Sequence, residues 1–225
     1  MEDYIIATTK TWNLAQFEAA RQRLPGRWTL FTSPDDLTFE VLNNLKPRYI
    51  FFPHWSWIVP KDIVDNFECV LFHMTDLPFG RGGSPLQNLI VRGNTSTKLT
   101  ALRMTTELDA GPIYLKSELS LEGRAKDIFV RASAMCFDMI EDIVTQQPEP
   151  YPQSGQVTVF NRRTPAESSL PLTGTIQGLF DHIRMLDAPS YPNAYLEYGD
   201  WKIEFTDSVI SDQGSLKARV TISRK

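Results

Sequence analysis

Four short apolar runs, at residues 4–8, 28–31, 49–52 and 69–72, constrain the fold more than any other feature. Each run is nearly all apolar, which is typical of strands that are covered on both faces of a sheet. Segments with helical spacing or turn residues separate the runs, and Leu14, Phe17 and Ala20 lie on one such helical face. This alternation predicts an α/β fold with a doubly wound, mostly parallel sheet, similar to a Rossmann fold.

The rest of the chain adds longer helices and a small C-terminal part. We predict helices at residues 33–45, 84–93, 125–144 and 176–186, an extended region at 98–121 with a turn at 109–112, and strands at 194–198, 201–205 and 216–222. Residues 148–155 are rich in proline, which predicts a linker. We therefore expect a catalytic domain at 1–147 and a small α+β subdomain at 156–225.

Charge and cysteine content narrow the classes of protein. The 225 residues carry a net charge of −4, which disfavours a nucleic-acid partner. Two cysteines cannot make a disulfide framework or a zinc site, so we expect a reducing, cytoplasmic setting and no metal. No apolar stretch is long enough for a membrane helix, and the acidic N-terminus does not resemble a secretory signal.

One histidine and one aspartate stand at positions where catalytic groups are expected. His73 follows the apolar run at 69–72 directly, where a side chain faces the ligand crevice of a parallel sheet. Glycines at 80, 82 and 83 let the backbone approach a ligand closely. Asp109 lies on a Leu-Asp-Ala-Gly-Pro turn. The two side chains could form a general acid–base pair.

Ordered motifs from about Phe52 to Phe205 resemble the folate-dependent formyltransferases. In that family a strand ends in Asn-x-His and is followed by a Leu-Pro-x-x-x-Gly loop and a Leu-Asp-x-Gly turn. This chain has His73, Leu77-Pro78, the glycines from Gly80 and Leu108-Asp109-Ala110-Gly111 in the same order. The segments at 160–165, 183–187 and 191–195 resemble the C-terminal part shared by the methionyl-tRNA and nucleotide-sugar enzymes.

The resemblance implies transfer of a formyl group from N10-formyltetrahydrofolate to an amine. His73 would donate to the oxyanion, and Asp109 would orient His73 and help to move protons. The family's Asn is Leu71 here, and the loss of one oxyanion donor costs about 2.7–4 kcal/mol of barrier unless another group replaces it. His54 is our candidate for that group, and the alternative is that His54 only sits in an aromatic loop.

Two loops are expected to hold the pterin ring. The resemblance assigns one wall to the loop after residues 49–52, with Ser56, Trp57 and Ile58. The opposite wall would consist of Met104, Thr105, Thr106, Glu107 and Leu108. Tryptophans so close to a sheet are often core residues, which is the alternative for Trp57.

The acceptor that we expect is the amine of a nucleotide-linked amino sugar, as used for lipopolysaccharide and O-antigen. Guanidinium groups pair with phosphate oxygens, so a diphosphate could meet arginines, although the same arginines could form a solvated basic corner. The expected substrate-binding residues are Arg81, Gly82, Gly83, Ser84, Asn88, Arg162, Arg163 and Arg184. The alternatives are another amine (methionyl-tRNA, glycinamide ribonucleotide or a hydroxyornithine-type amine) or a decayed homologue that only binds folate or a nucleotide. Exposed C-terminal strands could pair two subunits in a homodimer.

Overall fold

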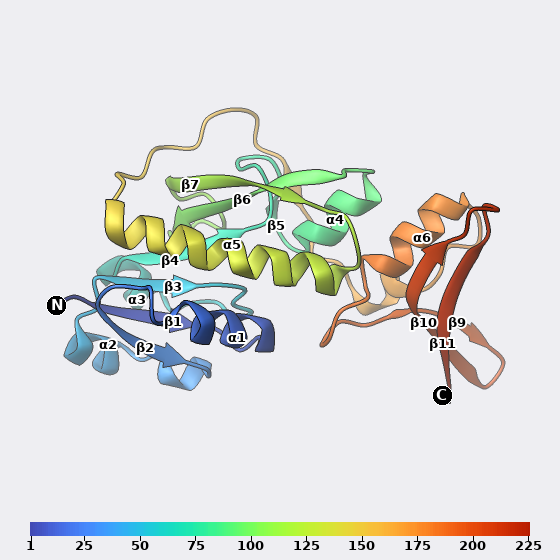
Figure 1. Ribbon diagram of the computed structural model, residues 1–225, viewed down its shortest axis with the longest axis horizontal. Coiled ribbons are helices and arrows are strands. Elements are labelled where there is room, and N and C mark those ends of the chain that lie inside the picture. Colours follow the sequence, from blue (N-terminus) through green and yellow to red (C-terminus); the bar gives the residue numbers. More distant parts are fainter. The chain divides into compact units, whose positions relative to one another are not determined.

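A six-stranded sheet forms the centre of the larger part of the molecule in the computed structural model, which describes residues 1–225 (Figure 1). Its strand order is β2-β1-β3-β4-β6-β7. The bounds are β1 Asp3–Ala7, β2 Arg27–Phe31, β3 Tyr49–Phe52, β4 Cys69–His73, β6 Ser96–Arg103 and β7 Ile113–Ser120. The β2-β1, β1-β3 and β3-β4 pairs are parallel, whereas β6 joins β4 in the antiparallel direction. The predicted mostly parallel α/β sheet is therefore confirmed.

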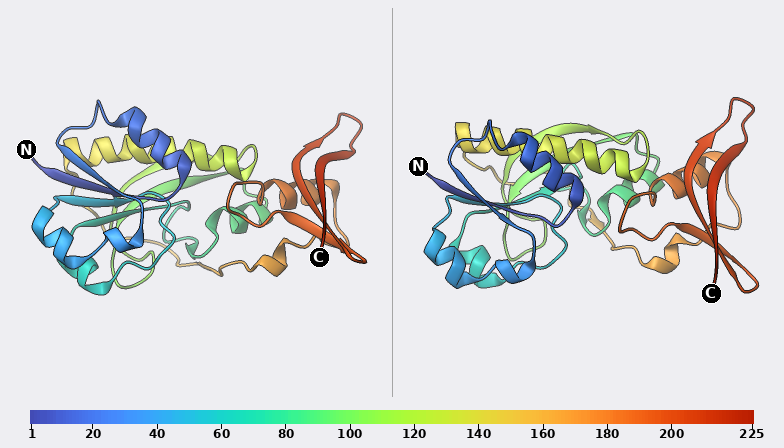
Figure 2. Two further views of the ribbon diagram at one scale, coloured as in Figure 1. Left: turned by 90° about the horizontal axis from the view of Figure 1, so that it is seen from below. Right: turned by 60° about the horizontal axis from the view of Figure 1, so that its bottom comes forward.

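Helices cover both faces of this sheet, as Figure 2 shows from two sides. Their bounds are α1 Thr11–Ala20, α2 Phe39–Leu45, α3 Lys61–Asn66 and α5 Ala125–Gln146. Helices α1 and α5 lie on one face, and α2 and α3 lie on the other. Phe17 of α1 contacts both Phe137 of α5 and Trp28 of β2, which joins this layer to the sheet.

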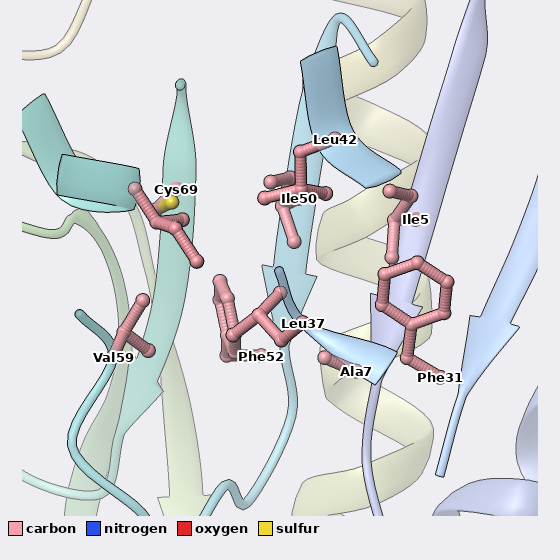
Figure 3. Close-up of a cluster of buried hydrophobic side chains, with 10 residues drawn as sticks. Ile5, Ala7, Phe31, Leu37, Leu42, Ile50, Phe52, Val59 and Cys69 are labelled. Atoms are coloured by element: carbon pink, nitrogen blue, oxygen red, sulfur yellow. The ribbon is translucent and has the colours of Figure 1, made fainter. Parts of the chain in front are cut away.

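Alternate residues of the strands supply the core on the α2 and α3 side (Figure 3). Because strand side chains alternate between faces, every second residue of β1, β3 and β4 points to this layer. The buried cluster consists of Ile5, Ala7, Phe31, Leu37, Leu42, Ile50, Phe52, Val59, Ile63 and Cys69. Burial of each large side chain among them contributes about 1.5–3 kcal/mol. This cluster fixes the strand ends from which the site residues follow.

The helix predicted at residues 33–45 is wrong as one continuous element. Ser33 does cap a helical turn, but that turn is a 3₁₀ helix over Pro34–Asp36 and it closes on itself through a capping box with Asp36. Leu37 leaves the helical region, and Thr38 then caps α2 by accepting a hydrogen bond from the Val41 backbone N–H. Two strong N-caps within six residues therefore produce two short elements.

The chain divides into two compact units. The first contains residues 1–82, 98–119 and 130–159, and the second contains 83–97, 120–129 and 160–225. The second unit holds α4 (Pro85–Val91), the 3₁₀ turn at Pro165–Ser168, α6 (Ile176–Arg184) and an antiparallel sheet of β9 (Ala194–Tyr198), β10 (Trp201–Ile210) and β11 (Leu216–Arg224). Two-residue strands β5 (Arg81–Gly82) and β8 (Val159–Phe160) also pair. The predicted domain boundaries at 147 and 156 stay a prediction.

The proline-rich segment at residues 148–155 makes specific contacts within the first unit. Tyr151 exchanges two backbone hydrogen bonds with Ile113, at 2.7 and 2.9 Å. A few residues later, the Thr158 carbonyl accepts from the backbone N–H groups of Gly80 and Arg81. This stretch therefore runs along the start of β7 and along the glycine loop. None of the helices is both long and apolar enough to span a lipid bilayer.

Candidate active site

His73 ends β4, at the carboxyl edge of the parallel strands. Its side chain shares the face of β4 with Leu71 and Cys69, because residues two apart in a strand point the same way. The imidazole is buried, and its Nδ1 lies 3.6 Å from Oδ2 of Asp109. The structure therefore brings together the two residues that the sequence singled out as a pair.

Asp109 reaches His73 from a strained turn between β6 and β7. Its φ is 53°, a left-handed conformation in which aspartate is tolerated better than most residues. Oδ2 accepts a 2.9 Å hydrogen bond from the Gly82 backbone N–H, and the carboxylate is buried. Gly111 allows the turn, because a Cβ there would lie 1.8 Å from the Arg103 carbonyl oxygen. The position of the carboxylate is thus set by its hydrogen bond to Gly82 and by the close packing of its turn against Arg103.

The loop after β4 returns to contact the histidine that precedes it. The Gly80 carbonyl oxygen lies 2.8 Å from Nε2 of His73. Gly80 has a φ of 77° and donates its own N–H to Thr158. Lys116 donates to the Leu77 carbonyl and to Asp76, which holds the beginning of the loop. The loop therefore orients the imidazole ring.

These contacts determine which nitrogen of His73 carries hydrogen. A carbonyl oxygen can only accept, so Nε2 is protonated and donates to Gly80. In the neutral ring Nδ1 then presents a lone pair toward the Asp109 carboxylate. Nδ1 and Oδ2 then face each other as two acceptors, and a proton donor on a ligand can be accepted by either. Nδ1 and Oδ2 are therefore the atoms of this pair that can exchange a proton with a ligand.

Leu71 occupies the family's Asn position, two residues before His73. It is partly buried and packs against the small apolar cluster of Leu77, Leu102 and Ile113. It also packs against the core cluster of Figure 3. Its side chain therefore contributes packing where the resemblance implies an amide donor.

His54 follows β3 and adopts a left-handed conformation with a φ of 53°. Its ring packs edge-on against Trp12, with 5.5 Å between ring centroids. Burial and the nearby Lys10 ammonium lower the pKa of His54 to about 3, so the ring is neutral at pH 7. The preceding Pro53 carbonyl accepts hydrogen bonds from Thr8 and Asn13. These contacts tie His54 to the start of α1, and its role as a substitute donor stays a prediction.

The two loops expected to hold the pterin ring both rest on the same core cluster. Trp55 packs on it from the loop after β3, and Met104 packs on it from the end of β6. Trp55 in turn contacts Trp57 at 5.0 Å. The tips of both loops are exposed and partly apolar, with Ile58 97% and Leu108 70% exposed, and Ser56, Trp57, Thr105, Thr106 and Glu107 are also exposed.

Gln153 is a residue of the site that sequence reasoning missed. Its Nε2 donates to the backbone carbonyls of Asp109 and Gly111, both at 2.8 Å. Its Oε1 accepts from Nε and a terminal nitrogen of Arg81, at 3.1 and 2.9 Å. Arg81 also pairs with Glu107 at 3.2 Å. The only signal was a polar residue in a proline-rich stretch, which carries no periodicity.

Most other expected substrate-binding residues lie in the second unit and make structural contacts there. Asn88 donates to three backbone carbonyls, those of Gly83, Ser84 and Asn161. Ser84 accepts from the Arg163 backbone N–H through Oγ, while the Arg163 guanidinium bonds to Glu167. A Cβ on Gly83 would lie 2.5 Å from Arg162, so this glycine is required by close packing.

Arg184 and Arg162 differ in what their guanidinium groups can do. Arg184 is buried and donates to the carbonyls of Leu121 and Gly123 and to Asp181. These bonds occupy the group inside the second unit, which argues against our expectation that Arg184 meets a diphosphate. Arg162 is exposed and makes no hydrogen bond or ion pair. Arg162 is therefore available to an anionic ligand.

Nowhere in residues 1–225 do three His, Cys, Asp or Glu side chains gather into a metal site.

Comparison with known proteins identifies two family models that match this chain. Residues 17–125 match the family model described as formyl transferase, and residues 165–223 match the model described as the C-terminal domain of methionyl-tRNA formyltransferase. The chain is 26% identical over 188 residues to methionyl-tRNA formyltransferase of Rickettsia canadensis, covering 80% of this chain and 61% of that protein. It thus spans about three fifths of the length of the curated relatives it matches.

Two solved structures give the likeness in three dimensions. A methionyl-tRNA formyltransferase from Clostridium thermocellum is 45% identical, with a TM-score of 0.96 and full coverage of both chains. A protein from Mycobacterium tuberculosis described as a likely sugar N-formyltransferase is 16% identical, with a TM-score of 0.71 and coverage of 100% of this chain and 97% of that one. The second likeness establishes the fold alone. The first, together with the family models, establishes that this chain belongs to the formyl transferase family.

Proposed function

We propose that this chain transfers a formyl group from N10-formyltetrahydrofolate to an amine, with His73 and Asp109 at the reacting centre. The observation that carries the proposal is the buried contact between Nδ1 of His73 and Oδ2 of Asp109, 3.6 Å apart at the carboxyl edge of the sheet. Membership of the formyl transferase family supplies the type of reaction.

Proton movement is the task that this pair can perform. The amine loses one proton when it attacks the formyl carbon, and the departing folate nitrogen takes up one proton. Asp109 can accept the first through its carboxylate, and His73 can pass a proton through Nδ1. Nε2 stays bonded to Gly80 throughout, which keeps the ring oriented while Nδ1 changes its protonation.

Stabilisation of the oxyanion then depends on the protonated form of His73. With Nε2 engaged by Gly80, only an Nδ1–H can point at a developing negative charge, and Leu71 supplies no donor. A preorganised donor of this kind lowers the activation free energy by about 2.7–4 kcal/mol. His54 remains our proposed second donor.

The exposed apolar side chains of the two loops suit the pterin of the co-substrate. Leu108 directly precedes Asp109 and is 70% exposed. Trp57 and Ile58 are exposed on the loop after β3. A flat bicyclic ring gains about 25 cal/mol for each Å² of apolar surface that it removes from water. Transfer of the formyl group itself is the chemistry that the bound co-substrate contributes.

Methionyl-tRNA is the acceptor that the comparisons favour. The structure that is 45% identical over the full chain bears that name, and residues 165–223 match the C-terminal domain model of the same enzymes. Arg162 is exposed and free to meet a phosphate of such a substrate. This acceptor would overturn our expectation that no nucleic acid binds.

A nucleotide-linked amino sugar is the second candidate. The net charge of −4 gives no general attraction to RNA, which suits a small substrate. The likely sugar N-formyltransferase from Mycobacterium tuberculosis also matches the chain over nearly its whole length, although at 16% identity. The diphosphate of such a substrate would again meet Arg162.

A direct assay separates the acceptors. Purified protein would receive N10-formyltetrahydrofolate together with initiator methionyl-tRNA, or with 4-amino sugars linked to UDP, GDP or dTDP. Release of tetrahydrofolate and formylation of the acceptor are measured in parallel. Turnover with methionyl-tRNA supports the first candidate, and turnover with a sugar alone supports the second. Folate binding without transfer to any acceptor refutes the enzymatic proposal and supports a decayed homologue.

A further inference from the structure

We infer that Gln153 is a positioning residue that holds Asp109 in register with His73. This inference rests on the proposed function, because it concerns the geometry of the same pair. Gln153 lies in the proline-rich stretch that sequence analysis assigns to a linker. It touches neither side chain of the pair, and it acts on the backbone of the turn that carries Asp109.

Both ends of the Gln153 carboxamide are matched chemically to their partners. The NH₂ group donates to two carbonyl oxygens, which can only accept. The oxygen accepts two bonds from Arg81, which can only donate. If the amide were flipped, its NH₂ group would face the N–H groups of Arg81 and its oxygen would face the two carbonyl oxygens. A glutamate could keep the contact with Arg81, but it would place an anion against the two carbonyls.

The Asp109 turn needs such a clamp because its own backbone conformation is unfavourable. Asp109 has a φ of 53°, and a residue other than glycine stays in this region only where its surroundings hold it there. Gly111 is pressed against Arg103 on the far side of the turn. Gln153 bonds the carbonyls on either side of Ala110, and so it fixes the segment between these two residues.

The same amide also links the turn to the glycine loop. Arg81 is followed by Gly82, whose N–H donates to Oδ2 of Asp109. Gln153 therefore links the backbone of Asp109 to the side chain of Arg81, which directly precedes Gly82. Loss of the amide should let the carboxylate shift relative to Nδ1 of His73, from which it is 3.6 Å away.

Three variants test the inference in a formyl-transfer assay. Gln153→Ala should lower kcat about 100-fold with little change in KM for N10-formyltetrahydrofolate, since a displacement of about 1 Å can cost that much. Gln153→Glu should lose as much, because it cannot donate to the two carbonyls. Gln156→Ala is the matched control: this exposed glutamine lies in the same segment and should leave kcat unchanged. Full activity in Gln153→Glu, or an unchanged kcat in Gln153→Ala, would overturn the inference.

A spectroscopic measurement keeps this inference separate from the proposed function. The chain has only three histidines, so ¹⁵N-histidine spectra are simple, and His73→Gln assigns the relevant signal. In Gln153→Ala the His73 Nδ1 resonance should move toward its position in Asp109→Asn, whereas in Gln156→Ala it should not move. An unmoved resonance in folded Gln153→Ala refutes the positioning role. Absence of formyl transfer by the wild-type protein refutes the proposed function, whatever the resonance does.

Discussion

Acidification should destabilise the protein through His54. The ring packs against Trp12 beside the Lys10 ammonium, and burial together with this charge lowers the pKa of His54 from 6.5 to about 3. The folded pKa lies below the unfolded one, so the unfolded chain binds a proton first as the pH falls. The stability that is present above pH 6.5 is therefore lost progressively between pH 6.5 and 3.

The size of this effect follows from the separation of the two pKa values. At pH 5 the unfolded imidazole is almost fully protonated and the folded one is almost fully neutral. The free energy of unfolding should then be at most about 2 kcal/mol lower than at pH 7. For a protein of this size the loss corresponds to a fall in Tm of about 4–8 °C.

Thermal unfolding of the wild type and His54→Asn at pH 7 and pH 5 measures the effect. Asparagine does not titrate in this range and tolerates the left-handed backbone at position 54. The other ionisable groups are common to both proteins, so the difference between the two acid-induced losses isolates His54. If both proteins lose the same stability on acidification, the assignment of a partly buried, neutral imidazole is refuted.

Three further predictions concern the two units separately. His73→Ala and Asp109→Asn should each lower kcat by about 10²–10⁴-fold, with unchanged circular dichroism, because both act on protons in the reaction. Arg184→Ala should lower the free energy of unfolding by about 1–3 kcal/mol in urea titrations, because it removes one partner of a partly buried ion pair and leaves two carbonyls without their donor, whereas Arg162→Ala should leave stability unchanged and raise KM for the acceptor. Gly111→Ala should prevent folding of the Asp109 turn, since its Cβ would overlap a carbonyl oxygen of β6, and proteolysis would detect the opened turn.

The strands of the sheet could be predicted closely because their cause is local in the sequence. Residues 49–52 were expected as a strand and are β3 with those bounds, and all four residues are buried. An apolar run that must be buried on both faces has few alternatives. The region at 33–45 could not be predicted as well, because two adjacent caps compete there, and the six-residue helix α3 carries too few residues to show a period.

The site could be predicted only where a residue stands at the end of a strand or on a marked turn. His73 and Asp109 satisfy this condition, and the structure brings them together. Gln153 does not, because its partners Asp109 and Gly111 are 44 and 42 residues away in the chain. The contacts of Arg184 could not be predicted for a different reason. An arginine near a family motif suggests an anionic ligand, and only the fold shows that its guanidinium donates to backbone carbonyls of the same unit.

The chemistry of this site is controlled by contacts to backbone carbonyls more than by contacts between side chains. The Gly80 carbonyl accepts from Nε2 of His73 and so leaves Nδ1 to face Asp109. The position of Gly80 depends in turn on its hydrogen bond to the Thr158 carbonyl. The Asp109 carboxylate is set by its turn, which Gln153 holds from the same stretch of chain. Both halves of the pair therefore depend on this stretch, through the Gln153 side chain and the Thr158 carbonyl. A change that removes either contact should alter the pair even when β4 and its core are unchanged, which a comparison of β4 sequences alone would never detect.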